Sequence, residues 1–191
     1  MKKRREYVAV LAFLAAIIGI SGCSRQKEEK LTKYDTQFFE LFDTVTSVTG
    51  YARDEKTFQS YVDVFYDELK EYHQLYDIYN DYEGINNIKT INDHAGIEPV
   101  EVDDKIIQML EEAVDIYELT DGNMNVAMGS VLSIWHEYRE AGLKHPEQAQ
   151  LPPQEELEEA AKHMDIRKMV IDPEKKTVYL EDPDMSLDVG A

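Results

Sequence analysis

Three short segments place polar and small residues where the surrounding sequence is apolar, and they are the strongest candidates for chemistry. Residues 42–44 (Phe-Asp-Thr) interrupt an apolar run. Residues 120–125 form a polar turn that leads into the small residues of 126–129, where backbone N–H groups could approach a ligand such as a phosphate. Residues 187–190 place a carboxylate before a glycine turn. Taken singly, each segment is better explained by turn formation or helix capping.

The other reactive side chains form no familiar catalytic pattern. The sequence has no G-x-G-x-x-G, P-loop, G-x-S-x-G or H-E-x-x-H motif. Its five histidines lack the spacing of metal ligands, so each is interpreted as a surface or helix-face residue. The single cysteine, Cys23, cannot form an internal disulfide framework.

The N-terminal residues read as an export and lipidation signal. Four basic residues at positions 2–5 precede fourteen uncharged residues at 7–20, which fits a secretory signal better than a membrane span. The following Ile-Ser-Gly-Cys resembles a bacterial lipobox, in which Cys23 carries a diacylglycerol. The alternative is a signal anchor with a chance cysteine. We expect a lipoprotein signal peptide over 1–22, a polar tether over 23–36, and a protein lipid-anchored on the extracytoplasmic face of a bacterial membrane.

The charge of the chain argues against nucleic-acid binding. The 191 residues carry a formal net charge of −19. Beyond the signal peptide, 38 acidic side chains stand against 16 basic ones. Such a surface repels phosphate backbones, and the sequence shows no basic stripe that would offset it.

Hydrophobic periodicity predicts an α+β domain that has a mixed sheet with packed helices. In the first half we expect a strand or hairpin entry over 37–52, a helix of about six turns after Asp54, a loop over 80–96, and a helix after Asp103 closed by Asp121-Gly122. In the second half we expect a short helix over 131–138 broken near Gly142 and a helix around 157–163. A hairpin of 169–171 with 177–180 and a last strand over 185–191 complete the prediction. Because this strand ends without a covering element, the chain is interpreted as the front portion of a larger protein.

Taken together, four stretches resemble the FAD:protein FMN transferase family, formerly called the thiamine-biosynthesis lipoprotein (ApbE) family. They are FDTVTSVTGYA, YHQLYDIYNDYEGINNIKTINDHAG, ELTDGNMNVAMGSVLSIWHEYRE and MSLDVGA, in the family's order and spacing. The resemblance implies that 37–191 is the N-terminal part of a T-fold-like flavin transferase domain. It also implies a Mg²⁺-dependent enzyme that moves FMN from FAD onto a threonine of a target flavoprotein and releases AMP. Targets of the family include flavin-carrying subunits of membrane redox complexes.

Matching the family's motifs position by position gives candidate site residues. Phe42 stands where the family usually has Met, and Tyr79 matches an aromatic that lies against the flavin nucleotide. Asp188 matches the carboxylate of the family's L-D-x-G segment, and Ala191 matches a residue that offers a backbone oxygen to Mg²⁺. The turn of the family's G-x-x-D motif corresponds to Asn123, Met124 and Asn125, where Asn125 replaces the usual Asp.

The resemblance also identifies what the chain lacks. The family pattern continues with a lysine-bearing glycine turn, a histidine-containing segment and carboxylates that complete the Mg²⁺ site, so we expect little or no transferase activity from this chain as it stands. Two alternatives remain: a lipoprotein that binds FAD or another nucleotide without transferring it, and a structural or solute-binding lipoprotein.

Overall fold

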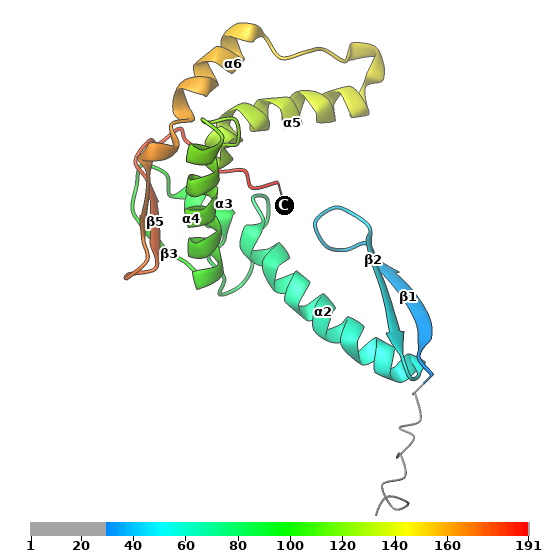
Figure 1. The fold of residues 1–191 in the computed structure, drawn as a ribbon. Coiled ribbons are helices and arrows are strands. Elements are labelled where there is room, and N and C mark those ends of the chain that lie inside the picture. The colour runs from blue at the N-terminus through cyan, green and yellow to red at the C-terminus, as the bar shows by residue number, and fades with distance from the viewer. Residues whose placement is uncertain (1–29, 191) are drawn as a thin grey trace, which may run out of the picture.

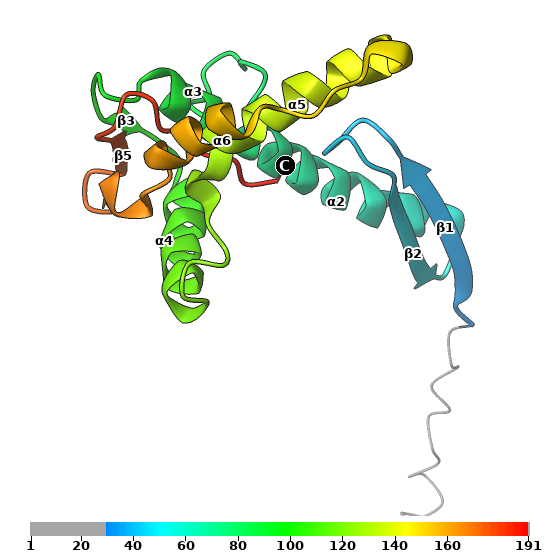
Figure 2. The same ribbon diagram turned by 90° about the horizontal axis from the view of Figure 1, so that it is seen from above.

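The computed structural model describes residues 30–190, in which one long helix joins a β-hairpin to a larger helical body (Figures 1 and 2). The hairpin pairs β1 (Thr32–Phe38) antiparallel to β2 (Thr46–Ala52). Helix α2 (Glu55–Tyr76) then runs from the hairpin to the body. No helix among these residues is long and apolar enough to span a membrane.

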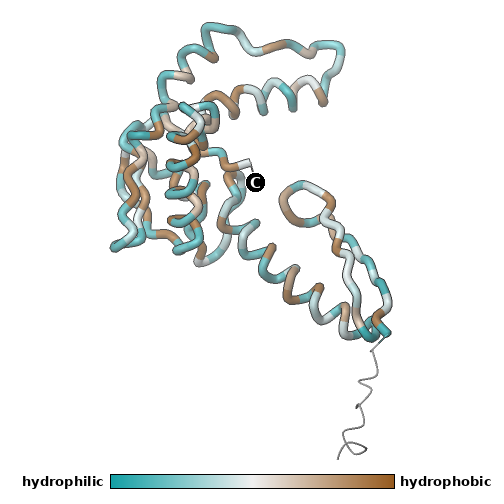
Figure 3. The backbone as a smooth tube through the Cα atoms, viewed as in Figure 1, coloured by the Kyte–Doolittle hydropathy of each residue, from teal (hydrophilic) through white to brown (hydrophobic). Residues whose placement is uncertain are grey.

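Helix α2 begins and packs as its sequence dictates. The carboxylate of Asp54 accepts a hydrogen bond from the Thr57 N–H at 2.8 Å and so caps the first turn. Apolar residues recur along the helix (Figure 3), and three of them, Phe58, Val62 and Leu75, are buried. Phe58 and Val62 pack beneath the hairpin, and Tyr34 of β1 stacks on Phe58 with 5.5 Å between ring centroids. The hairpin thus has a small apolar core of its own.

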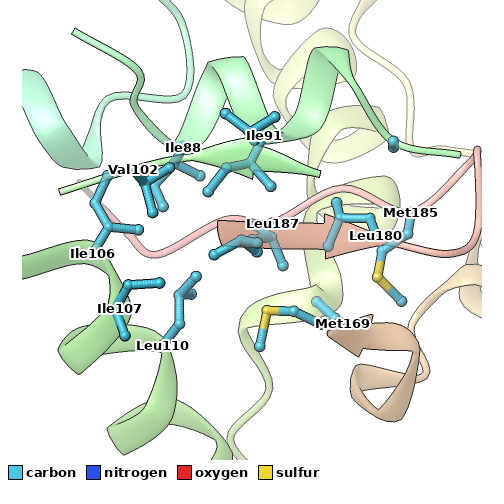
Figure 4. Packing of buried hydrophobic residues seen from close by; sticks show 14 of the residues in the cluster. Ile88, Ile91, Val102, Ile106, Ile107, Leu110, Met169, Leu180, Met185 and Leu187 are labelled. Atoms are coloured by element: carbon cyan, nitrogen blue, oxygen red, sulfur yellow. The ribbon is translucent and has the colours of Figure 1, made fainter. Parts of the chain in front are cut away.

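The main core lies in the helical body, around a three-stranded antiparallel sheet. The sheet has the order β3-β5-β4, from β3 (Val100–Glu101), β5 (Thr177–Leu180) and β4 (Met169–Asp172). Helices α3 (Ile88–Asp93) and α4 (Asp104–Leu119) contribute buried side chains to this core. In the close view of Figure 4, Leu187 lies amid side chains from both helices and the sheet.

The remaining helices connect α4 to the sheet. The 3₁₀ turn η1 (Val126–Met128) leads directly into α5 (Gly129–Lys144). After the 3₁₀ turn η2 (Pro146–Gln148), the chain returns through α6 (Gln154–Ala160) and the 3₁₀ turns η3 (Ala161–His163) and η4 (Ile166–Lys168). Helices α5 and α6 lie along one side of the body, and the C-terminal segment runs close to the start of α5 (Figure 1).

The α+β class is confirmed, but four local expectations are wrong. Strand β1 takes up residues 32–36 of the predicted tether, because Tyr34 packs on α2. The predicted loop 80–96 contains helix α3, which Asn87 and Thr90 begin with a capping box. Helix α5 continues through Gly142, since one glycine costs a helix only about 1 kcal/mol. Residues 185–190 form no strand, because their backbone bonds to η1, α5 and a side chain of α3.

Candidate functional site

A cavity of about 340 Å³ opens where the C-terminal segment passes between α5 and the turn after α2. Its size and its mix of aromatic, apolar and polar walls are typical of a small-molecule site. The lining residues come from four separate parts of the chain: Ile78, Tyr79, Asn92, Gly129, Ser133, His136, Glu137, Glu140, Ser186, Leu187 and Asp188.

Backbone hydrogen bonds fix the C-terminal wall of this cavity. The Gly129 N–H donates to the Ser186 carbonyl at 3.0 Å, and the Asp188 N–H donates to the Val126 carbonyl at 2.8 Å. The side-chain amide of Asn92 pairs with the backbone of Leu187 as a neighbouring strand would: its Nδ2 donates to the Leu187 carbonyl at 2.9 Å, and its Oδ1 accepts from the Leu187 N–H at 2.7 Å. These bonds hold the carboxylate of Asp188 at the cavity wall.

Gly129 permits this approach because it has no side chain. A Cβ at this position would lie 2.5 Å from the Ser186 carbonyl oxygen and 2.7 Å from its carbon. Its backbone is ordinary right-handed helix, with φ −54° and ψ −37°, so glycine is required here for space and not for conformation.

A buried carboxylate organises the opposite wall. Asp77, only 4% exposed, accepts hydrogen bonds from the Tyr79 N–H at 2.6 Å and the Tyr82 hydroxyl at 2.7 Å, and also from the backbone and side-chain N–H groups of Asn80. Burial acts to raise the pKa of Asp77, but these hydrogen bonds outweigh it and leave the pKa below its ordinary value. In turn, burial and the hydrogen bond to Asp77 raise the pKa of Tyr82 to about 12. The turn that presents Tyr79 is therefore built on a charged carboxylate.

Tyr79 extends from this turn toward α5. Its hydroxyl lies 2.8 Å from Nδ1 of His136, and the two ring centroids are 6.2 Å apart. Burial and the negative charge of Asp188 raise the pKa of Tyr79, so its phenol is neutral at physiological pH. The site thus offers a ring face, a phenol and an imidazole beside the carboxylates of Glu137, Glu140 and Asp188.

Two of the six predicted flavin contacts meet in this cavity. Tyr79 and Asp188, 109 positions apart, both line it. Phe42 does not line it: its N–H donates to Nδ1 of His73 at 3.2 Å, and its ring packs edge-on against that imidazole. Phe42 and Asp43 have φ values of 57° and 47°, a left-handed conformation that non-glycine residues rarely adopt. His73 also contacts Tyr82, so Phe42 is linked to the Tyr79 turn only through intermediates.

The predicted contacts of the turn after α4 serve local structure and lie outside the cavity lining. Asn123 Nδ2 donates to the Thr120 carbonyl at 2.7 Å, and the side chain of Met124 is half exposed. Asn125 Oδ1 accepts from the Ala127 N–H at 2.9 Å, while Nδ2 donates to the Met164 carbonyl at 2.9 Å. Asn125 thus uses both halves of its amide, which explains how Asn fits where the family has Asp. A flavin contact by any of the six residues stays a prediction.

Among residues 30–190, a single group of three potential ligands lies close enough together to suit a metal ion: His163, Asp182 and Asp184. It lies apart from the cavity, and the Lys168 ammonium donates to Asp182 Oδ2 at 2.6 Å. His163 Nδ1 lies 2.9 Å from Asp182 Oδ1. The lysine, acting against burial, lowers the pKa of Asp182 to about 2. A lysine thus already neutralises this carboxylate. The predicted lipidation at Cys23 and the predicted metal contact at Ala191 fall outside the described residues.

Sequence reasoning missed Asn92, Gly129 and His136. Gly129 lay in a segment singled out for close backbone approach, but the residue it approaches is 57 positions away. Asn92 is in the predicted loop, and no local signal distinguishes it from other turn asparagines. His136 was interpreted as a helix-face residue, and its partner is also 57 positions distant.

Curated relatives of known name match the chain over part of their length. It is 20% identical over 173 residues to an FAD:protein FMN transferase of Chlamydia pneumoniae, a match that covers 90% of this chain and 50% of that protein. It is 24% identical over 125 residues to an FAD:protein FMN transferase of Vibrio cholerae, covering 65% of this chain and 35% of that one. The chain thus spans about half the length or less of the curated relatives it matches.

Solved structures and a family model agree with these matches. The fold resembles the ApbE protein of Thermotoga maritima, with a TM-score of 0.66 at 23% identity over 83% of this chain and 48% of that one. It also resembles the flavin transferase ApbE of Vibrio cholerae, with a TM-score of 0.64 at 18% identity over 84% and 49% of the two chains. The model of the ApbE family matches residues 42–191. Because this match covers most of the sequence, the chain belongs to the ApbE family.

Proposed function

We propose that this chain forms the flavin-binding part of an FAD:protein FMN transferase. The observation that carries the proposal is the cavity in which Tyr79 and Asp188 meet beside Gly129. Family membership and the names of the curated relatives support it. In the proposed reaction, a threonine hydroxyl oxygen of a target flavoprotein bonds to the FMN-side phosphorus of FAD. The phosphoanhydride bond to AMP breaks, AMP leaves with the negative charge, and the proton of the threonine hydroxyl passes to solvent or to the AMP phosphate.

The described residues contribute binding and orientation to this reaction. Tyr79 offers a neutral aromatic wall, and Asp77 rigidifies the turn that carries it. The two hydrogen bonds between Asn92 and Leu187 and the contact with Gly129 fix the segment before Asp188. Holding the reactants in one geometry removes much of the entropic barrier to transfer.

A Mg²⁺ requirement is part of the proposal, but the described residues do not build the ion's site. Glu137, Glu140 and Asp188 supply the hard oxygen ligands that Mg²⁺ prefers. Among residues 30–190, however, their carboxylates do not converge as a metal-ligand group. We therefore assign no step of the reaction to the metal through these residues.

We further propose a membrane location and a membrane-associated partner. The lipobox-like sequence at Cys23 supports lipid anchoring on the extracytoplasmic face, and the family's targets support a flavin-carrying subunit of a membrane redox complex as acceptor. Expression in bacteria with a radiolabelled fatty acid should label the wild-type chain and leave Cys23→Ala unlabelled. An unlabelled wild-type chain would refute the anchor.

Titration of the purified chain with FAD, followed by flavin fluorescence, tests the proposed site. We expect saturable binding that Tyr79→Ala weakens, because the mutation removes an aromatic wall of the cavity. Incubation with FAD, Mg²⁺ and a threonine-bearing target, read by mass spectrometry, then tests transfer. Binding with little or no transfer is the result expected of a flavin-binding part, and it leaves the FAD- or nucleotide-binding lipoprotein as the alternative. Efficient transfer would contradict the expected lack of activity, and the absence of FAD binding refutes the flavin site.

A further inference from the structure

His136 is a cavity residue that neither the motifs nor the family resemblance singled out. It lies on α5 one turn beyond Ser133 and lines the cavity with it. Its Nδ1 lies 2.8 Å from the Tyr79 hydroxyl, and the planes of the two rings are inclined by 36°. The pair forms a single aromatic wall from elements that are distant in sequence.

The tautomer of His136 sets which partner donates in the hydrogen bond between the two side chains. Burial and the charge of Asp188 raise the pKa of Tyr79, so its phenol keeps its proton and can donate to Nδ1 of His136. An imidazole that accepts at Nδ1 carries its proton on Nε2 when neutral. In this tautomer, His136 has one ring nitrogen bonded to Tyr79 and one N–H donor left for another partner.

The charges of the cavity indicate which part of a ligand this donor meets. Glu137 and Glu140 line the same side of α5, and Asp188 lies in the facing wall. Three carboxylates in a small cavity repel a pyrophosphate but do not repel an uncharged, planar ring. The carbonyl oxygens and ring nitrogens of an isoalloxazine are uncharged acceptors that an imidazole N–H can reach.

We propose that His136 is a ligand-contacting and positioning residue: Nδ1 holds the Tyr79 ring, and Nε2–H donates to an acceptor on the isoalloxazine ring of the flavin. This inference rests on the proposed function, since it assumes that the cavity binds FAD. It assigns the flavin end of the dinucleotide, and not the pyrophosphate or adenine end, to this cavity.

Variants of the full chain separate the two roles of the imidazole. His136→Phe removes both nitrogens but keeps a ring, His136→Gln retains a donor near Nε2, and His136→Asn retains an acceptor near Nδ1. Dissociation constants for FAD, riboflavin and ADP are measured for each variant, together with urea unfolding. His145→Phe is the matched control, because His145 ends the same helix and lies outside the cavity lining.

We expect His136→Phe to weaken the binding of both FAD and riboflavin by roughly threefold to thirtyfold, because it removes one or two hydrogen bonds. His136→Gln should recover part of this affinity for both flavins. Because the two hydroxyl–imidazole partners are coupled, Tyr79→Phe combined with His136→Phe should weaken binding by less than the product of the single effects. The dissociation constant for ADP should be unchanged by His136→Phe, and those for FAD and riboflavin should be unchanged by the His145→Phe control.

Each other outcome overturns a distinct statement. Saturable FAD binding that His136→Phe leaves equal to the His145→Phe control refutes the role of His136, while the proposed function stands. If His136→Phe weakens the binding of ADP and FAD by the same factor and leaves riboflavin binding unchanged, the assignment of the cavity to the flavin ring is wrong. If the wild-type chain binds none of the three ligands, the proposed function and this inference both fail.

Discussion

Replacing Gly129 with alanine tests whether the cavity depends on a close backbone approach. The new Cβ would lie 2.5 Å from the Ser186 carbonyl oxygen, 2.7 Å from its carbon and 2.8 Å from its Oγ. Two of these three atoms are backbone, so rotating a side chain cannot relieve the overlap. The chain must instead move the 186–188 segment away from α5, which strains the hydrogen bonds of Ser186 and Asp188.

Two opposing effects set the change in the free energy of unfolding that Gly129→Ala causes. Alanine favours a helix over glycine by about 1 kcal/mol in a helix interior, and by less at a first position such as this one. Overpacking of a well-packed contact costs about 1–3 kcal/mol, and loss of a backbone hydrogen bond adds about 1 kcal/mol. We therefore expect Gly129→Ala to lower the free energy of unfolding by about 1–3 kcal/mol. Displacement of the cavity wall that carries Asp188 should also weaken FAD binding.

Gly142→Ala is the matched control, because it makes the same substitution within the same helix. Its Cβ would lie 3.3 Å from the Cβ of Ala149 and 3.8 Å from the Cα of Ala149, which belongs to an exposed loop. We expect the free energy of unfolding to stay the same or to rise by up to about 1 kcal/mol. Urea unfolding at 25 °C, with FAD titrations of both variants, measures the difference. If Gly129→Ala is as stable as Gly142→Ala and binds FAD like the wild type, the close approach does not organise the site.

Three other substitutions test polar contacts within the body, one apart from the cavity at Asp182 and two in turns that flank the cavity-lining segments. Asp182→Asn should lower stability by about 1–3 kcal/mol at pH 7, because it removes the carboxylate that Lys168 pairs with. The pKa of Asp182 falls from 3.8 to about 2 on folding, so the stability that its charge contributes is complete above pH 4 and is lost between pH 4 and 2. The free energies of unfolding of wild type and variant, measured in urea, should therefore converge in this pH range. Asp77→Ala should lower the free energy of unfolding by about 2–4 kcal/mol and weaken FAD binding, because it releases the turn that carries Tyr79. Thermal melts and FAD titrations that match the wild type would contradict this. Asn125→Asp should lower the free energy of unfolding by about 1–2 kcal/mol at pH 7, because a carboxylate would face the Met164 carbonyl. In urea unfolding, this loss of stability should shrink below pH 4, where the carboxylate is protonated. A loss that does not depend on pH would contradict the contact.

Local signals predicted much of the secondary structure. Asp54 and Asp103 cap helices α2 and α4 where the sequence placed their starts. The hairpin of β4 and β5 was also predicted, because two short, mostly apolar segments flank a turn of Asp-Pro-Glu-Lys-Lys. These elements follow from contacts within a few residues, which a sequence pattern records directly.

The wrong expectations have two causes: local signals that were weak or misread, and one contact between residues distant in the sequence. Helix α3 is six residues long and begins with Asn87 and Thr90, a weaker signature than a capping box with glutamate. Helix α5 tolerates Gly142 because the flanking residues already favour a helix. Residues 185–190 read as a strand, but the partner that Leu187 finds is the side chain of Asn92, 95 positions away.

The sequence by itself determined the family, the α+β class, the long helices and the presence of Tyr79 and Asp188 in family motifs. Only the tertiary structure decided that Tyr79 and Asp188 share a cavity with Gly129 and His136, while Phe42 and Asn123 lie outside its lining. The physical reason is that helices and turns are fixed by neighbours in the chain. A cavity is instead fixed by packing and hydrogen bonds between segments 57 to 95 residues apart, such as Tyr79 with His136 and Asn92 with Leu187.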